Sequence, residues 1–450
     1  MSLHVKTPLP TISFADKLAV IADVLLPTTA KGILLRRRTM TRLASSYNAD
    51  KRAIHRLQKI QEKYGDGPVL LSVLGRKHAL VLSQEDLKRV LDGAPHPFSP
   101  ASDEKSAALS HFEPHVSLIS EPGDRAVRRL VNDQALESTC PNHSLASQFV
   151  RVAREEARTL CSTSGTSISW NEFSPAWDRI VRRVVLGDGA RDDIELSALL
   201  KSLRADGNWS FLWPRNTSKR KAYMARLEQH LAKAEAGSLA AALSHTPKPE
   251  GATPCSQATH WIFAFDAGAI ATFSTLALLA THGEIRNRAI DDAQAAPTNQ
   301  PSKAMFPYLR SCLLEALRLW PTTMIVHRQA REETVWNGAT MKEGTSLLLF
   351  APYFHRDDRR LTFAHRFSPD IWMDDPGRTI LPFIPFSAGP GECPGRHVVL
   401  LVGAAMLAEI LASATLKLVG GQQLSPEREL PGTLDHFSLE LEIKTPADLL

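Results

Sequence analysis

The residues around Cys393 could hold an anionic sulfur beside a flat ligand. Residues 386–396 read Phe-Ser-Ala-Gly-Pro-Gly-Glu-Cys-Pro-Gly-Arg, and an apolar run of helical length, 398–412, follows them. The unpaired N–H groups and the positive dipole end at a helix N-terminus favour a thiolate over a thiol. Glycine on either side of the cysteine lets a planar ligand approach the backbone closely. The sequence therefore predicts a cysteine held as an anion and presented from a tight loop.

Two interpretations of Cys393 compete. An isolated cysteine in a soluble protein is most often a buried free thiol. A thiolate can also be the axial ligand of a haem iron, where it pushes electron density toward the metal. The spacing Phe386-x-x-Gly389-x-x-x-Cys393-x-Gly395 closely resembles the haem-binding signature of the cytochrome P-450 family. The resemblance implies a haem b (iron protoporphyrin IX) with Cys393 as the metal ligand and Phe386, Gly389 and Gly395 in the cofactor-binding loop.

A second motif supports the same family. Glu315 and Arg318 are three residues apart, so they share one helix face. A surface salt bridge is the common reading of such a pair. The apolar residues around it favour burial instead, and the pair resembles the Glu-x-x-Arg of the family's K helix. The resemblance implies that Arg366, from a downstream meander motif, completes a triad that supports the cysteine loop.

The resemblance also implies which residues hold the haem propionates. Arg328 stands where the family has an arginine in the first strand after the K helix, and its planar fork suits a carboxylate. Arg128 matches the arginine of the family's C-helix motif. Asp124 stands where a histidine or tryptophan is usual, and Gly391 replaces an arginine two places before the cysteine. We therefore expect Arg128, Arg328 and His327 to carry the propionates.

The segment 259–281 is almost wholly apolar, with one charge at Asp266 and one glycine at Gly268. Its length is compatible with a membrane span, but a helix that is apolar all round also marks the centre of a large soluble protein, and we favour this second reading. The segment resembles the family's central I helix. By that resemblance Ala267, Gly268, Ala271 and Thr272 face the oxygen.

The central helix departs from the family pattern Ala/Gly-Gly-x-Asp/Glu-Thr-Thr. Ile270 and Ala271 stand in place of the acid and the first alcohol, and neither can relay a proton. Thr272 could swing in, although it points about 100° away. Asp266 lies four residues before Ile270 on the same face, so it either feeds a water chain or is a buried acid satisfied by a neighbouring helix. A hydroxyl of the substrate is a third proton source.

Composition limits the class of protein. The chain has 450 residues, 43% of them hydrophobic, and its net charge of +5 comes from 53 basic and 48 acidic residues without a long block of one sign. Nucleic acid is therefore not indicated as a partner. Five cysteines, an odd number without a Cys-x-x-Cys pair, indicate neither a disulfide framework nor a zinc site, which fits a reducing compartment.

The N-terminal apolar stretch, 14–35, is interrupted by charged residues and by Pro27, so it predicts a kinked amphipathic helix without a membrane span or a cleaved signal. We expect a cytoplasmic protein. The division predicted is an N-terminal amphipathic segment, 1–46, and one haem-binding domain, 47–450. Short β-rich runs are expected at 68–82, 324–350, 416–419 and 437–443. The remainder is expected to be mainly helical, with a break near 163–166 and a loop or short helix at 284–304. The expected fold class is mainly α (α+β): a helical wedge with a central I-type helix and a small β-rich lobe.

The expected function is that of the family. It is an oxidoreductase, a haem-thiolate monooxygenase that inserts one oxygen atom into an apolar small molecule in specialised metabolism. Electrons would come from a ferredoxin or flavodoxin with its NAD(P)H reductase. Residues 209–213 and 434–437 and the central helix would line the substrate. The missing acid–alcohol pair keeps open a peroxide-dependent oxygenase and a haem isomerase or dehydratase. A non-catalytic haem sensor is the third alternative.

Overall fold

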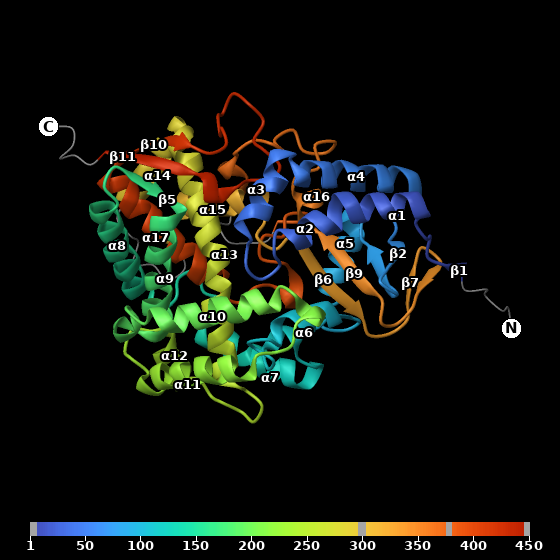
Figure 1. Ribbon diagram of the computed structural model, residues 1–450, viewed down its shortest axis with the longest axis horizontal. Coiled ribbons are helices and arrows are strands. Elements are labelled where there is room, and N and C mark those ends of the chain that lie inside the picture. The colour runs from blue at the N-terminus through green and yellow to red at the C-terminus, as the bar shows by residue number, and fades with distance from the viewer. Residues whose placement is uncertain (1–6, 296–302, 375–379, 445–450) are drawn as a thin grey trace.

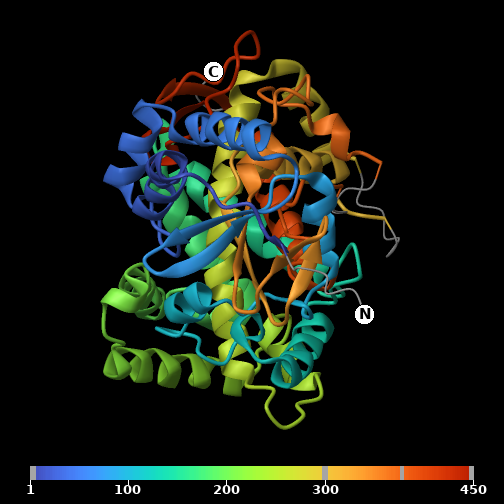
Figure 2. The ribbon, with the colours of Figure 1, turned by 90° about the vertical axis from the view of Figure 1, so that its right-hand side faces the viewer.

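The computed structural model describes residues 7–295, 303–374 and 380–444 of the chain. Helices form most of the body; two of the sheets gather in a lobe on one side of it, and the third sheet lies on the opposite side (Figure 1). Turned by 90°, the same structure shows this lobe in front of helix α13, which runs through the molecule from top to bottom (Figure 2). The predicted class, mainly α with a small β lobe, is confirmed.

The β lobe is built on a five-stranded sheet with the order β2-β3-β9-β6-β4. The β3–β9 pair is parallel and the other pairs are antiparallel. The strands of this sheet are β2 (Val69–Val73), β3 (Arg76–Leu80), β4 (Phe98–Ser99), β6 (Ile325–Ala330) and β9 (Ser346–Phe350). A smaller sheet pairs β1 (Thr7–Pro8), β8 (Ala339–Met341) and β7 (Thr334–Trp336). The Asn337–Gly338 turn between β7 and β8 has positive φ at both residues, as an Asn-Gly hairpin requires.

The helical body surrounds α13 (Pro254–Thr281), which packs against α9, α15 and α17. The other helices of the body are α5 (Gln84–Asp92), α6 (Asp103–Leu109), α7 (Pro122–Ala135), α8 (Ala146–Thr163), α9 (Trp170–Leu186), α10 (Ile194–Gly207), α11 (Thr217–Lys233), α12 (Leu239–His245), α14 (Gly283–Gln294), α15 (Pro307–Leu319), α16 (Ala351–His355) and α17 (Arg396–Ser413). The loop or short helix expected at 284–304 is a helix as far as Gln294, and residues 296–302 lie outside the described part.

Two helices of the described chain, α13 and α17, are long and apolar enough to cross a membrane by length and composition alone. Within their most apolar windows, 67% and 72% of the residues are buried inside the protein. Helices buried in this way form the core of the body, and this agrees with the central-helix reading of residues 259–281.

The N-terminal segment forms a kinked helical run followed by a separate helix. Its elements are α1 (Phe14–Val20), a π-helical stretch (Ile21–Leu25), α2 (Leu26–Ala30) and α3 (Arg38–Ser46). The ammonium of Lys31 lies 2.6 Å from Asp50 on α4 (Ala49–Tyr64), and both side chains are buried. The amide of Asn208 holds the backbone of residues 34 and 35. The segment is thus attached to α4 and to the end of α10; its division from the rest at residue 46 stays a prediction.

The expected final strand pair is present as β10 (Thr415–Gly420) and β11 (Glu440–Lys444). A third strand, β5 (Ser167–Ser169), joins it antiparallel to β11. The sequence at 163–166 indicated only a break between helices. Three residues are too short a run for alternation to reveal a strand, so β5 was not foreseen.

Candidate active site

The loop that carries Cys393 lies between a 3-10 turn (Gly389–Gly391) and the start of α17. The backbone N–H of Cys393 donates to the carbonyl of Phe386 at 2.9 Å, which closes the loop. Gly389 has φ +62°, and a Cβ there would lie 2.7 Å from the carbonyl oxygen of Leu91 on α5. Only glycine fits this position. Gly395 caps the N-terminus of α17.

The state of the Cys393 sulfur differs from the expectation. Burial raises the pKa of the thiol, and the backbone of Gly395 and the charges of Arg129 and Arg396 only partly offset this effect. The helix begins at Arg396, three residues after the cysteine, so its dipole acts from a distance. Burial thus disfavours the anionic form of Cys393 in the protein alone. A coordinated cation would favour that form, because a metal-bound thiol is deprotonated outright.

Three basic side chains gather beside this loop, which we call the cationic cluster: Lys105 of α6, Arg125 of α7 and Arg328 of β6. Arg328 donates to Ser387 and to the carbonyl of His327 at 3.0 Å each, and its Nε has no partner among the described residues. Arg125 reaches the carbonyls of residues 117 and 390 at 3.1 and 3.3 Å. Lys105 reaches those of residues 100 and 327 at 2.7 and 3.2 Å. No carboxylate of the described residues lies within 4.0 Å of these nitrogens.

The cluster is electrostatically incomplete. Burial lowers the pKa of Arg328 to about 10, and Arg125 adds to the effect. Burial, with Arg328 and Arg125, also holds the pKa of Lys105 well below its usual range. Buried charges without partners are costly. A ligand with two carboxylates would compensate the cluster, so the residues present fit the propionates of a haem whose iron Cys393 would hold.

The glycine at position 391 is explained by this arrangement. A Cβ on Gly391 would lie 2.7 Å from Nη2 of Arg328. The guanidinium of Arg328 therefore fills the space above the position where the resemblance leads one to expect an arginine. The side chain of Arg328, from β6, thus occupies the space that an arginine at position 391 would fill.

The other predicted propionate partners lie differently. The guanidinium of Arg128 is taken up by Asp124 at 2.9 Å, by Ser120 at 2.7 Å and by a backbone carbonyl at 2.9 Å. Arg125, one turn earlier on α7, faces the cysteine loop instead. Burial and neighbouring Lys105 lower the pKa of His327 to about 4, so its ring is neutral near pH 7, and its Nδ1 has no partner. Arg128 and His327 as cofactor ligands remain predictions.

The predicted catalytic residues of α13 divide between two faces. Ala267 is half-buried, as are Ala264 and Ile270, which share its face. A Cβ on Gly268 would lie 2.4 Å from Val399 of α17 and 2.8 Å from Trp177 of α9, so this glycine lets three helices meet closely.

Thr272 is 1% exposed, and its hydroxyl points at Gly403 of α17, where an added Cβ would lie 2.7 Å away. It therefore packs between helices, away from the face of Ala267. Ala271 is buried on the Ala267 side of the helix.

Asp266 forms an ion pair with Arg204 of α10. Arg204 also donates to the carbonyl of Leu34 at 2.6 Å. This partner on a neighbouring helix favours the reading of Asp266 as a satisfied acid, and a part for Asp266 in proton supply remains a prediction.

The Glu315–Arg318 pair is fully buried, with a nitrogen–oxygen distance of 2.7 Å. Glu315 accepts from the backbone of Ser368 and from the indole of Trp372 at 2.9 Å each. Arg318 donates to backbone carbonyls, that of Arg366 among them at 2.9 Å. The side chain of Arg366 is exposed, so its expected role in a triad is wrong. The carbonyl groups of the meander take that role, and no residue type signals them.

A hollow of about 810 Å³ lies where α6, the β2–β3 turn and a 3-10 turn (Ser210–Leu212) meet. Arg76, His111, Phe211 and Trp213 contribute to its wall. Part of the expected substrate-lining run 209–213 is therefore at this opening. The second expected segment, 434–437, instead packs inward, with His436 against the ring of Trp170 at 4.6 Å.

Comparison with known proteins gives the family. Residues 262–439 match the family model described as "Cytochrome P450". "Probable cytochrome P450 4ac1" of Drosophila melanogaster is 28% identical over 178 residues, 38% of this chain and 35% of that protein. "Cytochrome P450 monooxygenase nodW" of Hypoxylon pulicicidum is 30% identical over 37% of this chain and 34% of its own length. "Cyclooctat-9-en-7-ol 5-monooxygenase" of Streptomyces melanosporofaciens is 31% identical over 35% of this chain and 37% of its own length.

The alignments thus span about a third of the relatives' own length. The matched region contains the Cys393 loop, the buried Glu315–Arg318 pair, Arg328 and the face of α13 that carries Ala267. With the helical body, the β lobe and a cationic cluster that fits two propionates, this match places residues 262–439 of the chain in the cytochrome P-450 family, whose cofactor is a haem held by a cysteine thiolate.

Proposed function

We propose that this protein is a haem-thiolate monooxygenase that inserts one atom of dioxygen into an apolar small molecule. The observation that carries the proposal is the meeting of the Cys393 loop with Lys105, Arg125 and Arg328, a cationic cluster that lacks carboxylate partners among the described residues. Electrons come from a ferredoxin- or flavodoxin-type protein and its NAD(P)H reductase. The reaction takes place in the cytoplasm, as part of specialised metabolism.

Each part of the site has a role in this proposal. Cys393 would hold the iron, and the cationic cluster would hold the propionates. The bound haem supplies the redox chemistry that activates dioxygen. Ala267, Ile270 and Ala271 present an apolar face of α13 that binds apolar substrate surface and excludes water. Gly268 lets α13 lie close against α17, the helix that follows the cysteine loop.

Proton supply is the point at which this chain differs from its family pattern. Ile270 and Ala271 cannot donate a proton, Thr272 faces α17, and Asp266 is engaged by Arg204. The proton would therefore come from bound water or from a hydroxyl of the substrate. The same observation favours a second candidate function: an oxygenase that uses hydrogen peroxide, or a haem isomerase or dehydratase, neither of which needs the acid–alcohol pair.

One relative supports the substrate class. Its name describes a monooxygenase acting on an alcohol, cyclooctat-9-en-7-ol, and it shares 31% identity with the matched part of this chain. An apolar molecule that carries a hydroxyl is consistent with the apolar face of α13 and with a proton taken from the substrate.

Turnover with isotopically heavy oxygen tests the proposal. One reaction contains ferredoxin, its reductase, NADPH and heavy dioxygen; the other contains heavy hydrogen peroxide alone. We expect a heavy-oxygen product in the first only, lost in Cys393→Ser and kept in Cys140→Ser, a matched change at an exposed cysteine. A heavy-oxygen product only in the peroxide reaction would contradict the monooxygenase and support the peroxide-dependent oxygenase.

A further inference from the structure

A buried acid and a histidine form a pair that the proposed mechanism does not use. Nδ1 of His260 lies 2.9 Å from Oε1 of Glu113. Glu113 has no exposed side-chain surface, and its Oε2 has no partner among the described residues. His260 keeps 23% of its side chain accessible although α13 is a core helix. The imidazole therefore borders open space.

His260 lies on the face of α13 that carries Ala267 and Ala271. Residues 260, 264, 267 and 271 are four, three and four apart, which places them along one side of the helix. Ala267 is seven positions after His260, and at a rise of about 1.5 Å per residue this is about 10 Å. The rings of Phe112 and Phe263 meet edge to face beside the histidine, with centroids 5.3 Å apart. The Glu113–His260 pair thus places polar groups on the apolar face of α13, about two helical turns before Ala267.

A hydrogen-bond network fixes the segment that carries Glu113 onto α13. Gln257, one turn before His260, donates to the carbonyl of His115 at 3.0 Å and accepts from the backbone of Ser117 at 3.3 Å. The amide of Asn132 donates to Gln257 at 2.8 Å and accepts from the indole of Trp261 at 2.6 Å. Satisfied buried networks of this kind rigidify their surroundings. Glu113 is therefore held in place before a ligand arrives.

The chemistry of the pair defines what it can bind. Burial opposes the charged form of His260, but Glu113 raises the pKa of the ring above its usual value, and Lys105 is the opposing cation. Because Nδ1 is engaged by the carboxylate, the ring nitrogen left over is Nε2, a donor in the protonated ring. Arg204 lies over the ring of Phe263 at 5.0 Å, but its charge is balanced by Asp266, so His260 is the donor of this site. The site therefore suits an acceptor oxygen.

We propose that His260, oriented by Glu113, binds a hydrogen-bond-accepting oxygen of the substrate, from a carboxylate, carbonyl or hydroxyl group, about 10 Å from the carbon oxidised beside Ala267. This inference rests on the proposed function for the position of the oxidised carbon. It makes His260 a specificity-determining residue and Glu113 a positioning residue. A purely apolar substrate would leave the donor of His260 unpaired, which costs affinity.

Equilibrium binding to the haem-loaded protein tests the inference. The probes are decanoate, 1-decanol and decane, which share a chain and differ in the terminal oxygen. We expect the wild type to bind the two oxygen-bearing probes more tightly than decane. His260→Phe, which keeps a ring and removes the donor, should weaken them about tenfold, or about 1.4 kcal/mol, and leave decane unchanged. If His260→Phe weakens the binding of decanoate more than that of decanol, the oxygen bound by His260 belongs to a carboxylate.

Two further variants keep the test decisive. Glu113→Gln keeps the shape of the pair but removes its charge, and it should weaken decanoate several-fold even if His260→Phe fails to fold. His230→Phe is the matched control, because His230 pairs with Asp193 at 2.8 Å between α11 and the start of α10. It should leave all three affinities unchanged.

A wild type without preference among the probes, or a His260→Phe variant that keeps the preference, overturns the inference. Binding needs no turnover, so failure of the oxygenation experiment is a separate result.

Discussion

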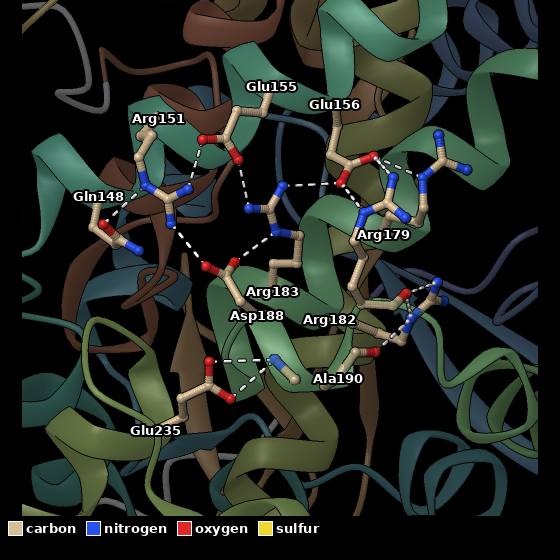
Figure 3. Close-up of polar contacts among 12 residues, drawn as sticks. Gln148, Arg151, Glu155, Glu156, Arg179, Arg182, Arg183, Asp188, Ala190 and Glu235 are labelled. Carbon is tan, nitrogen blue, oxygen red and sulfur yellow. Dashed lines mark hydrogen bonds and ion pairs between the residues drawn. The ribbon is translucent and has the colours of Figure 1, made fainter. Parts of the chain in front are cut away.

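Two groups of buried and half-buried basic side chains in this protein differ in what balances their charge. Around Glu156 of α8, which is 1% exposed, the guanidinium groups of Arg179, Arg183 and Arg191 converge at 2.6 to 2.9 Å (Figure 3). Glu155 and Asp188 supply further carboxylates to Arg183, at 2.6 Å each. In the cationic cluster, Lys105, Arg125 and Arg328 meet only carbonyl and hydroxyl oxygens of the described chain.

The difference separates a structural network from a binding site. Burial alone would raise the pKa of Glu156, but Arg191 and Arg179 hold it below its usual value, so the Glu156 network is complete without a ligand. In the cationic cluster, burial lowers the pKa of all three basic groups, and Glu104 at Lys105 and Asp133 at Arg125 only partly offset this lowering. A buried charge that the protein itself does not balance indicates a binding site, where a ligand of opposite charge balances it.

Breaking the Glu156 network should have the largest effect on stability. Glu156→Gln removes the carboxylate that three arginines share, and we expect a loss of about 3 kcal/mol in the free energy of unfolding. Denaturant unfolding of the haem-free protein measures it. Haem affinity of the folded fraction should not change. An unchanged unfolding midpoint would show that the network contributes nothing.

Removing a charge from the cationic cluster should stabilise the haem-free protein, whereas breaking the Glu156 network destabilises it. Arg328→Met takes away an uncompensated charge, so the haem-free protein should gain about 1 kcal/mol, while haem binding weakens about tenfold. Arg183→Met is the matched change in the Glu156 network, where it should destabilise the haem-free protein. If Arg328→Met destabilises the haem-free protein as much as Arg183→Met does, the contrast between the two regions fails.

The same contrast predicts a pH dependence. The pKa of Lys105 is lowered well below its usual value in the folded protein, so the unfolded chain binds more protons. The free energy of unfolding of the haem-free protein should therefore rise with pH between the lowered pKa of Lys105 and the usual lysine pKa of about 10.4. Lys105→Met should flatten this rise, as unfolding curves across pH would show. A slope that survives in Lys105→Met would belong to another group.

The smallest effect is expected at Arg366. Its side chain is exposed and only its backbone carbonyl meets Arg318, so Arg366→Ala should change the free energy of unfolding by less than about 0.5 kcal/mol. Thermal unfolding beside Glu315→Gln, which breaks the buried pair, gives the scale. A loss at Arg366 comparable with that at Glu315 would restore the side-chain triad.

The parts of the site that follow one stretch of sequence could be predicted. The Cys393 loop, the buried Glu315–Arg318 pair and the central helix depend on local spacing, and they are where the sequence indicated. Glycine at position 391 reads only as a missing arginine until β6 is placed beside it and Arg328 fills the space.

The parts that depend on how helices are rotated against their neighbours could not be predicted. Arg125 and Arg128 are one turn apart, and only the packed structure shows which of them faces the cysteine loop. Thr272 was expected at the oxygen side, but the rotation of α13 turns it toward α17. The Glu113–His260 pair joins residues 147 positions apart, so no local pattern announces it.

The central claim is that the cationic cluster is completed by the carboxylates of the cofactor. The most direct test compares binding of haem with binding of its dimethyl ester, in which both propionates are neutral, to the haem-free protein. The account predicts that the wild type binds haem at least about tenfold more tightly than the ester and that Arg328→Met narrows this difference. Equal affinity of the wild type for haem and ester would contradict it.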